Sequence, residues 1–296
     1  MLQCPQCHKD SRLCFTSRDY NRKISRQRFQ HYRCSSCGLI FISPIPPDLG
    51  KYYPETYYAV PATREQLAGN SEPERFKIEL VNRFITNGRL LEIGPAYGCF
   101  TWLAKEAGFE TEAIEMDARC CRFLTDVMGI KAVNNSDTAA ALEGLEPYNV
   151  ITLWHVIEHL PDPWTTLEAM CKKLLPGGIL VIAAPNPDAF QFHVLGRYWP
   201  HVDAPRHLML IPASVIAKKV EALGFKTVLL TTTDKGSLGW NGFGWEQFFS
   251  NFCSLRYINR ILRMIGRVVS IVMKPIERVE GRGSAYTLVL KKEKLG

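Results

Sequence analysis

The sequence has no apolar run long enough to cross a bilayer, and its first residues lack the basic-then-apolar order of a secretory signal. These two absences exclude a transmembrane helix and predict a cytoplasmic protein. In that reducing compartment, the ten cysteines are expected to bind metal or to pack as thiols. The hydrophobic (46%) and charged (22%) fractions are ordinary, which excludes a disordered, collagenous or coiled-coil chain.

The net charge of +7 is distributed unevenly along the chain. Residues 1–38 carry eight basic and two acidic residues, and residues 251–296 carry ten basic and three acidic ones. Both ends are therefore basic, whereas the segment between them is net acidic. Basic ends favour partners that bear phosphate, such as nucleic acid, nucleotide sugars or anionic lipid, although a solvated surface explains the same charge.

Short apolar stretches alternate with helical patterns from residue 75 onward. Strands are predicted at 89–93, 110–114, 131–133, 149–153, 179–184, 226–231 and 285–291. Helices are predicted at 75–85, 99–107, 118–128, 162–174 and 213–223. This alternation is typical of βαβ units and predicts an α/β fold, Rossmann-like and doubly wound, with a mostly parallel seven-stranded sheet.

Four regions follow from this pattern. We expect a small ribbon at 1–45, a linker or lid at 46–74, a main domain formed by 75–235 with 284–296, and a helical insertion at 236–283. Four tyrosines fall in the second region, Tyr52, Tyr53, Tyr57 and Tyr58. They are expected either to pack the ribbon against the main domain or to fold over a bound ligand.

The ribbon contains two CxxC pairs, Cys4 with Cys7 and Cys34 with Cys37. Four thiolates at this spacing suit the tetrahedral coordination of zinc, which would stabilise a segment too small to build its own core. A redox role is less favoured, because a thioredoxin-like CxxC follows a strand inside a βαβ unit. The sequence therefore predicts a structural zinc site.

A glycine-containing turn, LLEIGPAYGCF at residues 90–100, connects the first predicted strand of the main domain to a helix. It does not match the dinucleotide pattern G-x-G-x-x-G, because Ala96 and Cys99 replace two of the glycines. Glu115 lies 21 residues after Gly94, at the end of the second strand. A carboxylate at that position can accept hydrogen bonds from both hydroxyls of a ribose.

This turn resembles motif I of the class I S-adenosylmethionine-dependent methyltransferases, E/D-x-G-x-G-x-G. The likeness continues through YNVITLWHVIEHLPDP (148–163), LLPGGILVIAAPNP (174–187) and YWPHVDAPRHL (198–208). Together these segments look like the methyltransferase subfamily common in surface-sugar and small-molecule biosynthesis, in which a zinc ribbon often precedes the catalytic domain. The resemblance implies S-adenosylmethionine as the cofactor.

The resemblance also implies which residues bind this cofactor. The methionine end would lie on Glu92, Gly94, Ala96 and Gly98, the ribose on Glu115 beside Met116, and the floor beneath the sulfonium would be Leu153, Trp154 and His155. Ala96 stands where the family has a glycine, which an alanine tolerates if its φ is negative. Asn149 replaces an aspartate that is common in the family.

Two histidine clusters are candidates for catalysis. His155, Glu158 and His159 share one face if this segment is helical, and they are expected to provide a general base, to bind a divalent metal, or to fix the loop by hydrogen bonds. His207, with His201, Asp203 and Arg206, follows the fifth strand and is expected at the same sheet edge. His207 is a second candidate base, and Arg206 a candidate for binding phosphate or carboxylate, although a structural role explains both.

The insertion contains a segment, 255–274, with arginines along one side and aliphatic residues along the other. This pattern predicts a helix lying in a membrane interface, so we expect peripheral association with the anionic inner face of the membrane. The alternative is that the apolar side packs on the enzyme or on a second copy.

The sequence thus predicts an enzyme that transfers methyl groups from S-adenosylmethionine to a small-molecule, sugar or lipid-linked acceptor, for example in cell-surface polysaccharide biosynthesis. One alternative is an RNA methyltransferase that holds RNA with its basic ribbon. RNA is less favoured, because the fourth strand is not followed by the N/D-P-P-Y/F turn of base-methylating enzymes. Another alternative is a binding module that has lost catalysis.

Overall fold

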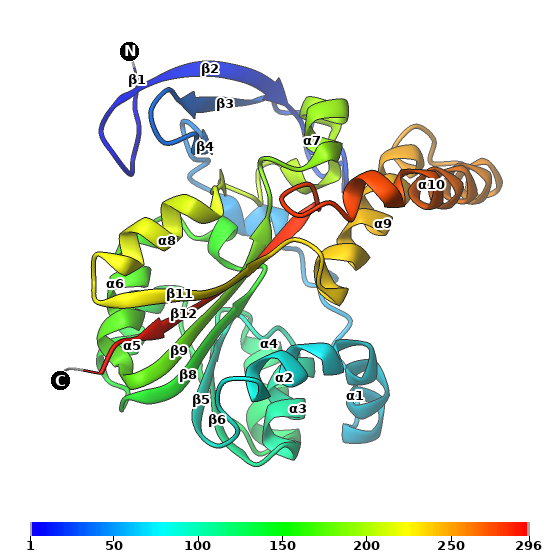
Figure 1. The fold of residues 1–296 in the computed structure, drawn as a ribbon. Helices are drawn as coiled ribbons and strands as arrows, with labels where there is room; N and C mark the ends of the chain where they lie inside the picture. The colour runs from blue at the N-terminus through cyan, green and yellow to red at the C-terminus, as the bar shows by residue number, and fades with distance from the viewer. Residues whose placement is uncertain (1, 295–296) are drawn as a thin grey trace.

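The computed structural model describes residues 2–294, and its largest element is a seven-stranded sheet in the order β11-β12-β9-β8-β5-β6-β7 (Figure 1). Six strands point the same way, and β12 is antiparallel to both of its neighbours. The strands are β5 Gly88–Ile93, β6 Phe109–Glu115, β7 Lys131–Asn134, β8 Tyr148–Trp154, β9 Leu174–Pro185, β11 Phe225–Thr231 and β12 Ala285–Lys292. The predicted doubly wound α/β fold is confirmed.

Helices cover both faces of this sheet. One face carries α5 (Thr138–Glu143), α6 (Pro163–Lys173) and α8 (Ala213–Glu221). The other carries α2 (Arg75–Asn82) and α3 (Cys99–Glu106), with α4 (Ala118–Arg122) and the π turn that extends it to Val127 nearby. The central strands are buried from both sides, which is why they are almost continuously apolar.

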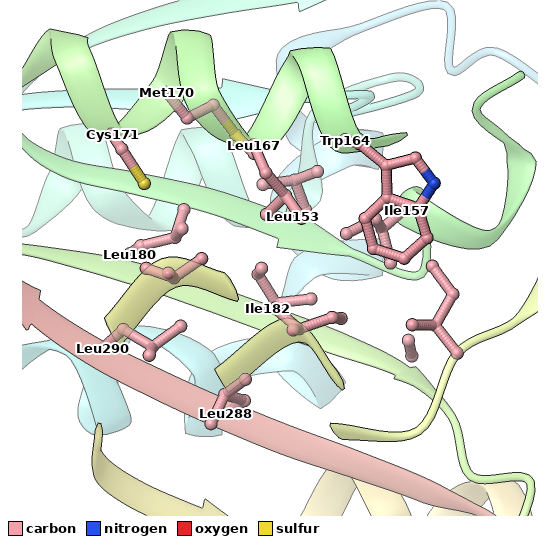
Figure 2. Packing of buried hydrophobic residues seen from close by; sticks show 14 of the residues in the cluster. Leu153, Ile157, Trp164, Leu167, Met170, Cys171, Leu180, Ile182, Leu288 and Leu290 are labelled. Atoms are coloured by element: carbon pink, nitrogen blue, oxygen red, sulfur yellow. The ribbon is translucent and has the colours of Figure 1, made fainter. Parts of the chain in front are cut away.

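Helix α6 illustrates how sequence periodicity produces this packing. Asp162 caps its first turn and Pro163 occupies the first helical position, both of which favour a helix start. Figure 2 shows Trp164, Leu167 and Met170 facing the sheet, three residues apart and therefore on one side of the helix. Complete burial of each such side chain contributes about 1.5–3 kcal/mol.

The N-terminal ribbon forms a second sheet. Its own strands are β1 Leu2–Gln3, β2 Asp10–Ser17, β3 Phe29–Cys34 and β4 Ile40–Ile42. A fifth strand, β10 (Met209–Leu210), pairs antiparallel with β4 although it belongs to the histidine-containing segment of the main domain. The ribbon is therefore joined to the main domain through a shared sheet.

The region expected as a linker or lid, 46–74, is largely structured and is not an extended linker. It contains the turn η1 (Leu49–Tyr52), helix α1 (Arg64–Ser71) and the turn η2 (Glu72–Glu74). Leu67 of α1 is fully buried in a cluster with side chains of α3 and of the π turn. The composition concealed this helix, because Leu67 is its main apolar anchor among polar residues.

The insertion folds as two packed helices, α9 (Lys235–Ser250) and α10 (Arg256–Glu277), which project from the body of the molecule in Figure 1. Both lie in the insertion that was expected to be helical, but an amphipathic pattern was found only for the second, because four glycines lower the helix propensity of α9. Within residues 2–294, no helix is both long and apolar enough to span a bilayer.

Candidate functional site

A cavity of about 360 Å³, called the donor cavity below, opens at the carboxyl ends of β5, β6 and β8. This edge of a doubly wound sheet is where ligands of such folds bind. Most of the residues expected to bind the cofactor line it: Glu92, Gly94, Ala96, Glu115, Met116, Trp154 and His155. Strands β5 and β8 are neighbours, so motifs about 60 residues apart in sequence meet here.

The backbone of the glycine turn agrees with the expectation at Gly94 and differs from it at Ala96. Gly94 has a φ of +66°, and a Cβ there would lie 2.6 Å from a methyl carbon of Val156, so only glycine fits. Ala96 has a φ of +52°, contrary to the expected negative value. Its backbone N–H donates to Oε2 of Glu115 at 2.9 Å, which stabilises this conformation.

Glu115 is held in place by the backbone. Its other oxygen, Oε1, accepts from the N–H of Asp117 at 2.7 Å, and the side chain is 3% exposed. Burial raises the pKa of Glu115 to about 7. Glu92 is also buried and accepts from the hydroxyl of Thr101, and burial raises the pKa of Glu92 to about 7. Two fixed acceptors above a glycine turn fit the ribose and the cationic end of S-adenosylmethionine.

Two residues expected at the cofactor do not line this cavity. The side chain of Leu153 is fully buried in the core and faces α6, so it does not form the floor beneath the sulfonium (Figure 2). Gly98 caps α3, and a Cβ there would meet Leu124 at 2.4 Å, so this glycine permits packing. Trp154, the next residue on β8, points to the opposite face and does line the cavity.

Several lining residues were not assigned to the cofactor from the sequence. They are Tyr53, Tyr57, Tyr58, Glu74, Lys77 and Trp240. The sequence did suggest a role for the tyrosine-dense segment, because folding over a ligand was one of the two roles expected for it. Tyr52 is fully buried against Phe29 of the ribbon, which agrees with the packing role, whereas the other three tyrosines line the donor cavity, and their folding over a ligand stays a prediction. Nothing in the sequence around Trp240 indicated a position at the cofactor.

A larger cavity of about 890 Å³, called the acceptor cavity below, adjoins the donor cavity. His155, Tyr57, Tyr58, His159 and Trp240 line both, and the ring centroids of His155 and Trp240 are 4.5 Å apart. The acceptor cavity also reaches Glu158, His207 and the first turns of α10. The two predicted histidine clusters are therefore brought together in one site.

The segment around His155 is a tight turn and not the regular helix that the spacing suggested. His155 has a φ of +58°, and a 3₁₀ turn, η4, covers Ile157–His159. The backbone N–H of His155 donates to the carbonyl of Ala183 on β9, which fixes the turn. Nδ1 of His155 lies 3.6 Å from Oε1 of Glu158, an ion-pair distance.

Glu158 is the charged centre of this cluster. It is 1% exposed, and within residues 2–294 neither of its oxygens has a hydrogen-bond donor. Burial alone disfavours the charged carboxylate, but His155, His207 and His159 around it lower the pKa of Glu158 to about 2. A buried carboxylate that stays ionised can orient a histidine and stabilise its positive charge.

The other two histidines contact backbone carbonyls through Nδ1, and Nδ1 of His159 also lies 3.0 Å from the hydroxyl of Tyr53. Nδ1 of His159 donates to the carbonyl of Arg206 at 3.0 Å, and Nδ1 of His207 donates to the carbonyl of His201 at 2.7 Å. Burial and the neighbouring His207 lower the pKa of His159 to about 4, so it is neutral at pH 7. One ligand atom each from Glu158, His159 and His207 lies within 4.8 Å of the others, so this group could also hold a metal ion.

The expectation that Arg206 binds a substrate anion is wrong. Its side chain is fully buried and donates to both oxygens of Asp203, at 2.8 and 2.7 Å. It also donates to Asp19 of the ribbon at 2.7 Å. Arg206 therefore joins the ribbon to the main domain, and its guanidinium is already satisfied by two carboxylates.

The four ribbon cysteines converge as predicted. Their Sγ atoms lie 3.4–3.8 Å apart for the pairs Cys4–Cys37, Cys7–Cys34 and Cys7–Cys37. Four thiolates around one zinc ion, each about 2.3 Å from it, would be separated by nearly this distance. The ribbon therefore presents a four-thiol cluster of the size that a tetrahedral metal site requires.

Known proteins share the central part of this chain. Residues 64–230 match a family described as a methyltransferase domain. The ubiquinone biosynthesis O-methyltransferase of Caulobacter sp. (strain K31) is 30% identical over 103 residues, 33% of this chain and 41% of the relative. The enzyme of that name from Cereibacter sphaeroides (strain ATCC 17023) is 28% identical over 117 residues, 38% and 47%. The chain thus spans less than half the length of these relatives.

A solved structure shares the fold. The crystal structure of a SAM-dependent methyltransferase from Archaeoglobus fulgidus superposes with a TM-score of 0.52 at 21% identity, covering 77% of this chain and 97% of that one. The family match covers more than half of the residues, and the donor cavity carries the motif expected for the cofactor. The chain therefore belongs to the class I S-adenosylmethionine-dependent methyltransferases.

Proposed function

We propose that this methyltransferase methylates a hydroxyl oxygen of a small molecule or sugar that lies in the acceptor cavity. The observation that carries the proposal is the position of His155, which lines both cavities and is paired with the buried carboxylate of Glu158. A general base at the junction of donor and acceptor is needed when the attacking atom still holds a proton. The O-methyltransferase names of the relatives agree with this chemistry.

On the donor side, the residues of this chain hold the cofactor in position. We assign Glu115 to the ribose hydroxyls, and Glu92 with the turn at Gly94 and Ala96 to the methionine end. When bound, S-adenosylmethionine supplies an electrophilic methyl group on a positively charged sulfur. Tyr57 and Tyr58 line the same cavity and limit the access of water to it.

On the acceptor side, His155 is the base. Its Nδ1 faces Glu158, which leaves Nε2 to accept the proton of the acceptor hydroxyl. Glu158 orients the ring and stabilises the imidazolium that forms. His159 and His207 donate their Nδ1 protons to backbone carbonyls and line the acceptor cavity, where Nε2 of His207 lies 4.0 Å from Oε1 of Glu158. A divalent ion on Glu158, His159 and His207 is the alternative to this proton network.

We further propose that the ribbon cysteines hold a structural zinc ion. The size of the four-thiol cluster supports this, as does the shortness of the strands that surround it. Zinc here would maintain the loops of the ribbon, one of which carries Arg22 and Lys23 to the acceptor cavity.

The acceptor class can be tested with labelled methyl donor and a cell extract separated into RNA, lipid-linked glycan and small-molecule pools. We expect label in the glycan or small-molecule pool. Label confined to RNA would contradict the proposed acceptor and favour the alternative in which the basic ribbon holds RNA.

The base can be tested with His155→Ala. Loss of a general base lowers kcat by about 10²- to 10⁴-fold, whereas we expect donor affinity to change by less than about threefold. His193→Ala removes an exposed histidine that lines neither cavity and is the matched control. Loss of donor binding in His155→Ala would contradict the base assignment. Activity abolished by a chelator and restored by a divalent ion, with the ribbon intact, would support the metal alternative.

A further inference from the structure

Five cationic side chains line the acceptor cavity, and the reaction proposed above does not use them. They are Arg22, Lys23, Arg256, Arg260 and Arg263, called the cationic arm below. Two come from the loop that follows β2 in the ribbon, and three come from the first two turns of α10. Segments more than 200 residues apart in the sequence therefore contribute positive charge to one cavity.

Hydrogen bonds fix these two segments against each other. Nζ of Lys23 donates to the carbonyl of Asn251 at 3.1 Å and to Oγ of Ser254 at 3.4 Å. Nδ2 of Asn251 donates to Oδ1 of Asn21 at 3.1 Å. These contacts hold the two segments together, while the five cationic side chains themselves are exposed at the cavity.

The charge of this arm is not compensated by the protein. In the part of the chain that the structure describes, no carboxylate lies within 4 Å of any of the five cationic groups. The carboxylates that line the cavity are Glu158, which lies among the histidines, and Asp203, which pairs with Arg206. Like charges gathered in a concave site attract an anion from solution.

We infer that the cationic arm binds a phosphate or diphosphate group of the acceptor. This inference rests on the proposed function, since it assumes that the hydroxyl of the same molecule reaches His155. Guanidinium groups suit this ligand, because each can donate two parallel hydrogen bonds to phosphate oxygens. Both a nucleoside diphosphate sugar and a prenyl diphosphate sugar carry the required group.

Inorganic pyrophosphate is the probe, measured by calorimetry on the full chain at low salt and without methyl donor. We expect Arg256→Ala combined with Arg260→Ala to weaken binding by at least about tenfold, the loss expected for removing charge-assisted hydrogen bonds. Arg267→Ala is the matched control, because this arginine lies on the same helix, pairs with Glu246 and does not line the cavity. Equal affinity in the double variant, or no binding by the native chain, would overturn the inference.

Competition experiments separate the sources of the phosphate. Tighter binding of a nucleoside diphosphate than of pyrophosphate assigns a nucleotide-linked acceptor, and tighter binding of a prenyl diphosphate assigns a lipid-linked one. A single-stranded RNA oligonucleotide that displaces pyrophosphate more strongly than either would overturn the inference in favour of RNA. If the native chain binds pyrophosphate and the double variant does not, but no pool of the extract is methylated, the phosphate site stands and only the proposed reaction is contradicted.

A second observation concerns the outer face of α10. Its aliphatic and aromatic side chains are between 40% and 77% exposed, an unusually apolar surface for one helix. They are Tyr257, Ile258, Ile261, Met264, Ile265, Val268, Ile271 and Val272. The opposite face packs on α9, where Gly266 lies against the backbone of Trp245 and Glu246. The prediction that the apolar side packs on the enzyme is thus not what the described residues show.

The charged residues beside this outer face indicate which kind of partner it binds. Arg256, Arg260, Arg263, Arg267 and Lys274 run beside it, and the single acidic residue of α10, Glu277, is buried and hydrogen bonded to Gln191 and Trp245. A second copy docked on this face would bring two sets of arginines together without carboxylates to pair them. An anionic lipid surface satisfies both the apolar face and the basic flank.

The geometry points to α10 lying on an anionic membrane surface. Cosedimentation with phosphatidylglycerol-containing vesicles should retain the chain, and pure phosphatidylcholine vesicles should retain much less. Met264→Asn combined with Val268→Asn should reduce binding at least about tenfold, since each removes exposed apolar area that the bilayer would bury. Leu230→Asn, an exposed apolar residue on β11, is the matched control. Unchanged sedimentation, or a dimer that the double variant dissociates, would overturn this assignment.

Discussion

The donor and acceptor cavities share His155 and Trp240 but are built in different ways. The donor cavity is formed mainly by the ends of β5, β6 and β8, all inside the segment that matches the methyltransferase family. The acceptor cavity also takes residues from the ribbon and from α9 and α10, which lie outside that segment. The donor cavity thus lies mainly within the part that the family shares, whereas the acceptor cavity also uses parts of this chain outside the family match.

The largest expected effect is a loss of methyl transfer that leaves donor binding almost unchanged. Cys4→Ser should remove a ligand of the proposed zinc ion and unfold the ribbon loops, since structural zinc sites contribute about 10–16 kcal/mol to folding. Methyl transfer should fall by at least about 100-fold because Arg22 and Lys23 lose their positions, whereas donor affinity should change by less than about threefold. Label transfer and calorimetry measure the two quantities.

Cys14→Ser is the control for this experiment, because Cys14 is an exposed ribbon cysteine outside the four-thiol cluster. Equal loss of donor binding in Cys4→Ser would mean that the two cavities are not independent.

The second effect is confined to the donor cavity. Glu115→Ala removes two acceptors for the ribose, and charge-assisted hydrogen bonds of about 1.5–3 kcal/mol predict a donor Kd at least about 100-fold higher. Pyrophosphate binding in the acceptor cavity should not change. Glu110→Ala, on the exposed start of the same strand, is the control for calorimetry. A native-like donor Kd in Glu115→Ala would remove the main support for the donor assignment.

The third effect is a pH dependence of donor binding. Burial raises the pKa of Glu115 and of Glu92 to about 7, so both carboxyls are protonated in more acidic solution and must lose a proton to bind a cationic donor. Donor affinity should therefore rise with pH up to about 7, by as much as tenfold per pH unit for each group. Calorimetry across this range measures it, and Glu115→Gln should reduce the slope. A donor affinity that does not change with pH in the native chain would contradict this prediction.

The smallest expected effect follows from a change in the packing of α10 and concerns only the acceptor cavity. Gly266→Ala places a Cβ 2.7 Å from Cα of Glu246, and such overpacking costs about 1–3 kcal/mol. The thermal midpoint should fall by a few degrees and methyl transfer by severalfold, with donor affinity unchanged, because α10 carries three arginines of the cationic arm. Gly239→Ala in α9 meets nothing within 4 Å and is the control. An unaltered midpoint in Gly266→Ala would show that α10 can shift without cost.

The sequence predicted the features that depend on local pattern. Strands β5, β8 and β9 were expected from apolar runs between turn residues, and the donor motif from a glycine turn with a carboxylate at a fixed distance. The cysteine cluster followed from two CxxC pairs. In each case the residues that matter are close in sequence or occur at a spacing that topology fixes.

The features that the sequence did not predict depend on contacts between distant segments. Helix α9 contains four glycines, and packing against α10 and β12 overrides its low propensity. The positive φ of Ala96 requires Glu115 as its hydrogen-bond partner. A substrate contact and a structural role were both left open for Arg206, because nothing in its sequence neighbourhood shows that Asp19, 187 residues away, would reach it.

The buried pairing of Arg206 with Asp19 and Asp203 constrains any attempt to exchange parts between related enzymes. A transplanted ribbon without an aspartate at this position would leave buried N–H groups of the guanidinium without their acceptor, although Asp203 still balances its charge. Chimeras meant to alter substrate choice should therefore transfer residues 1–45 together with 198–210, so that the arginine and both of its aspartates move as one unit.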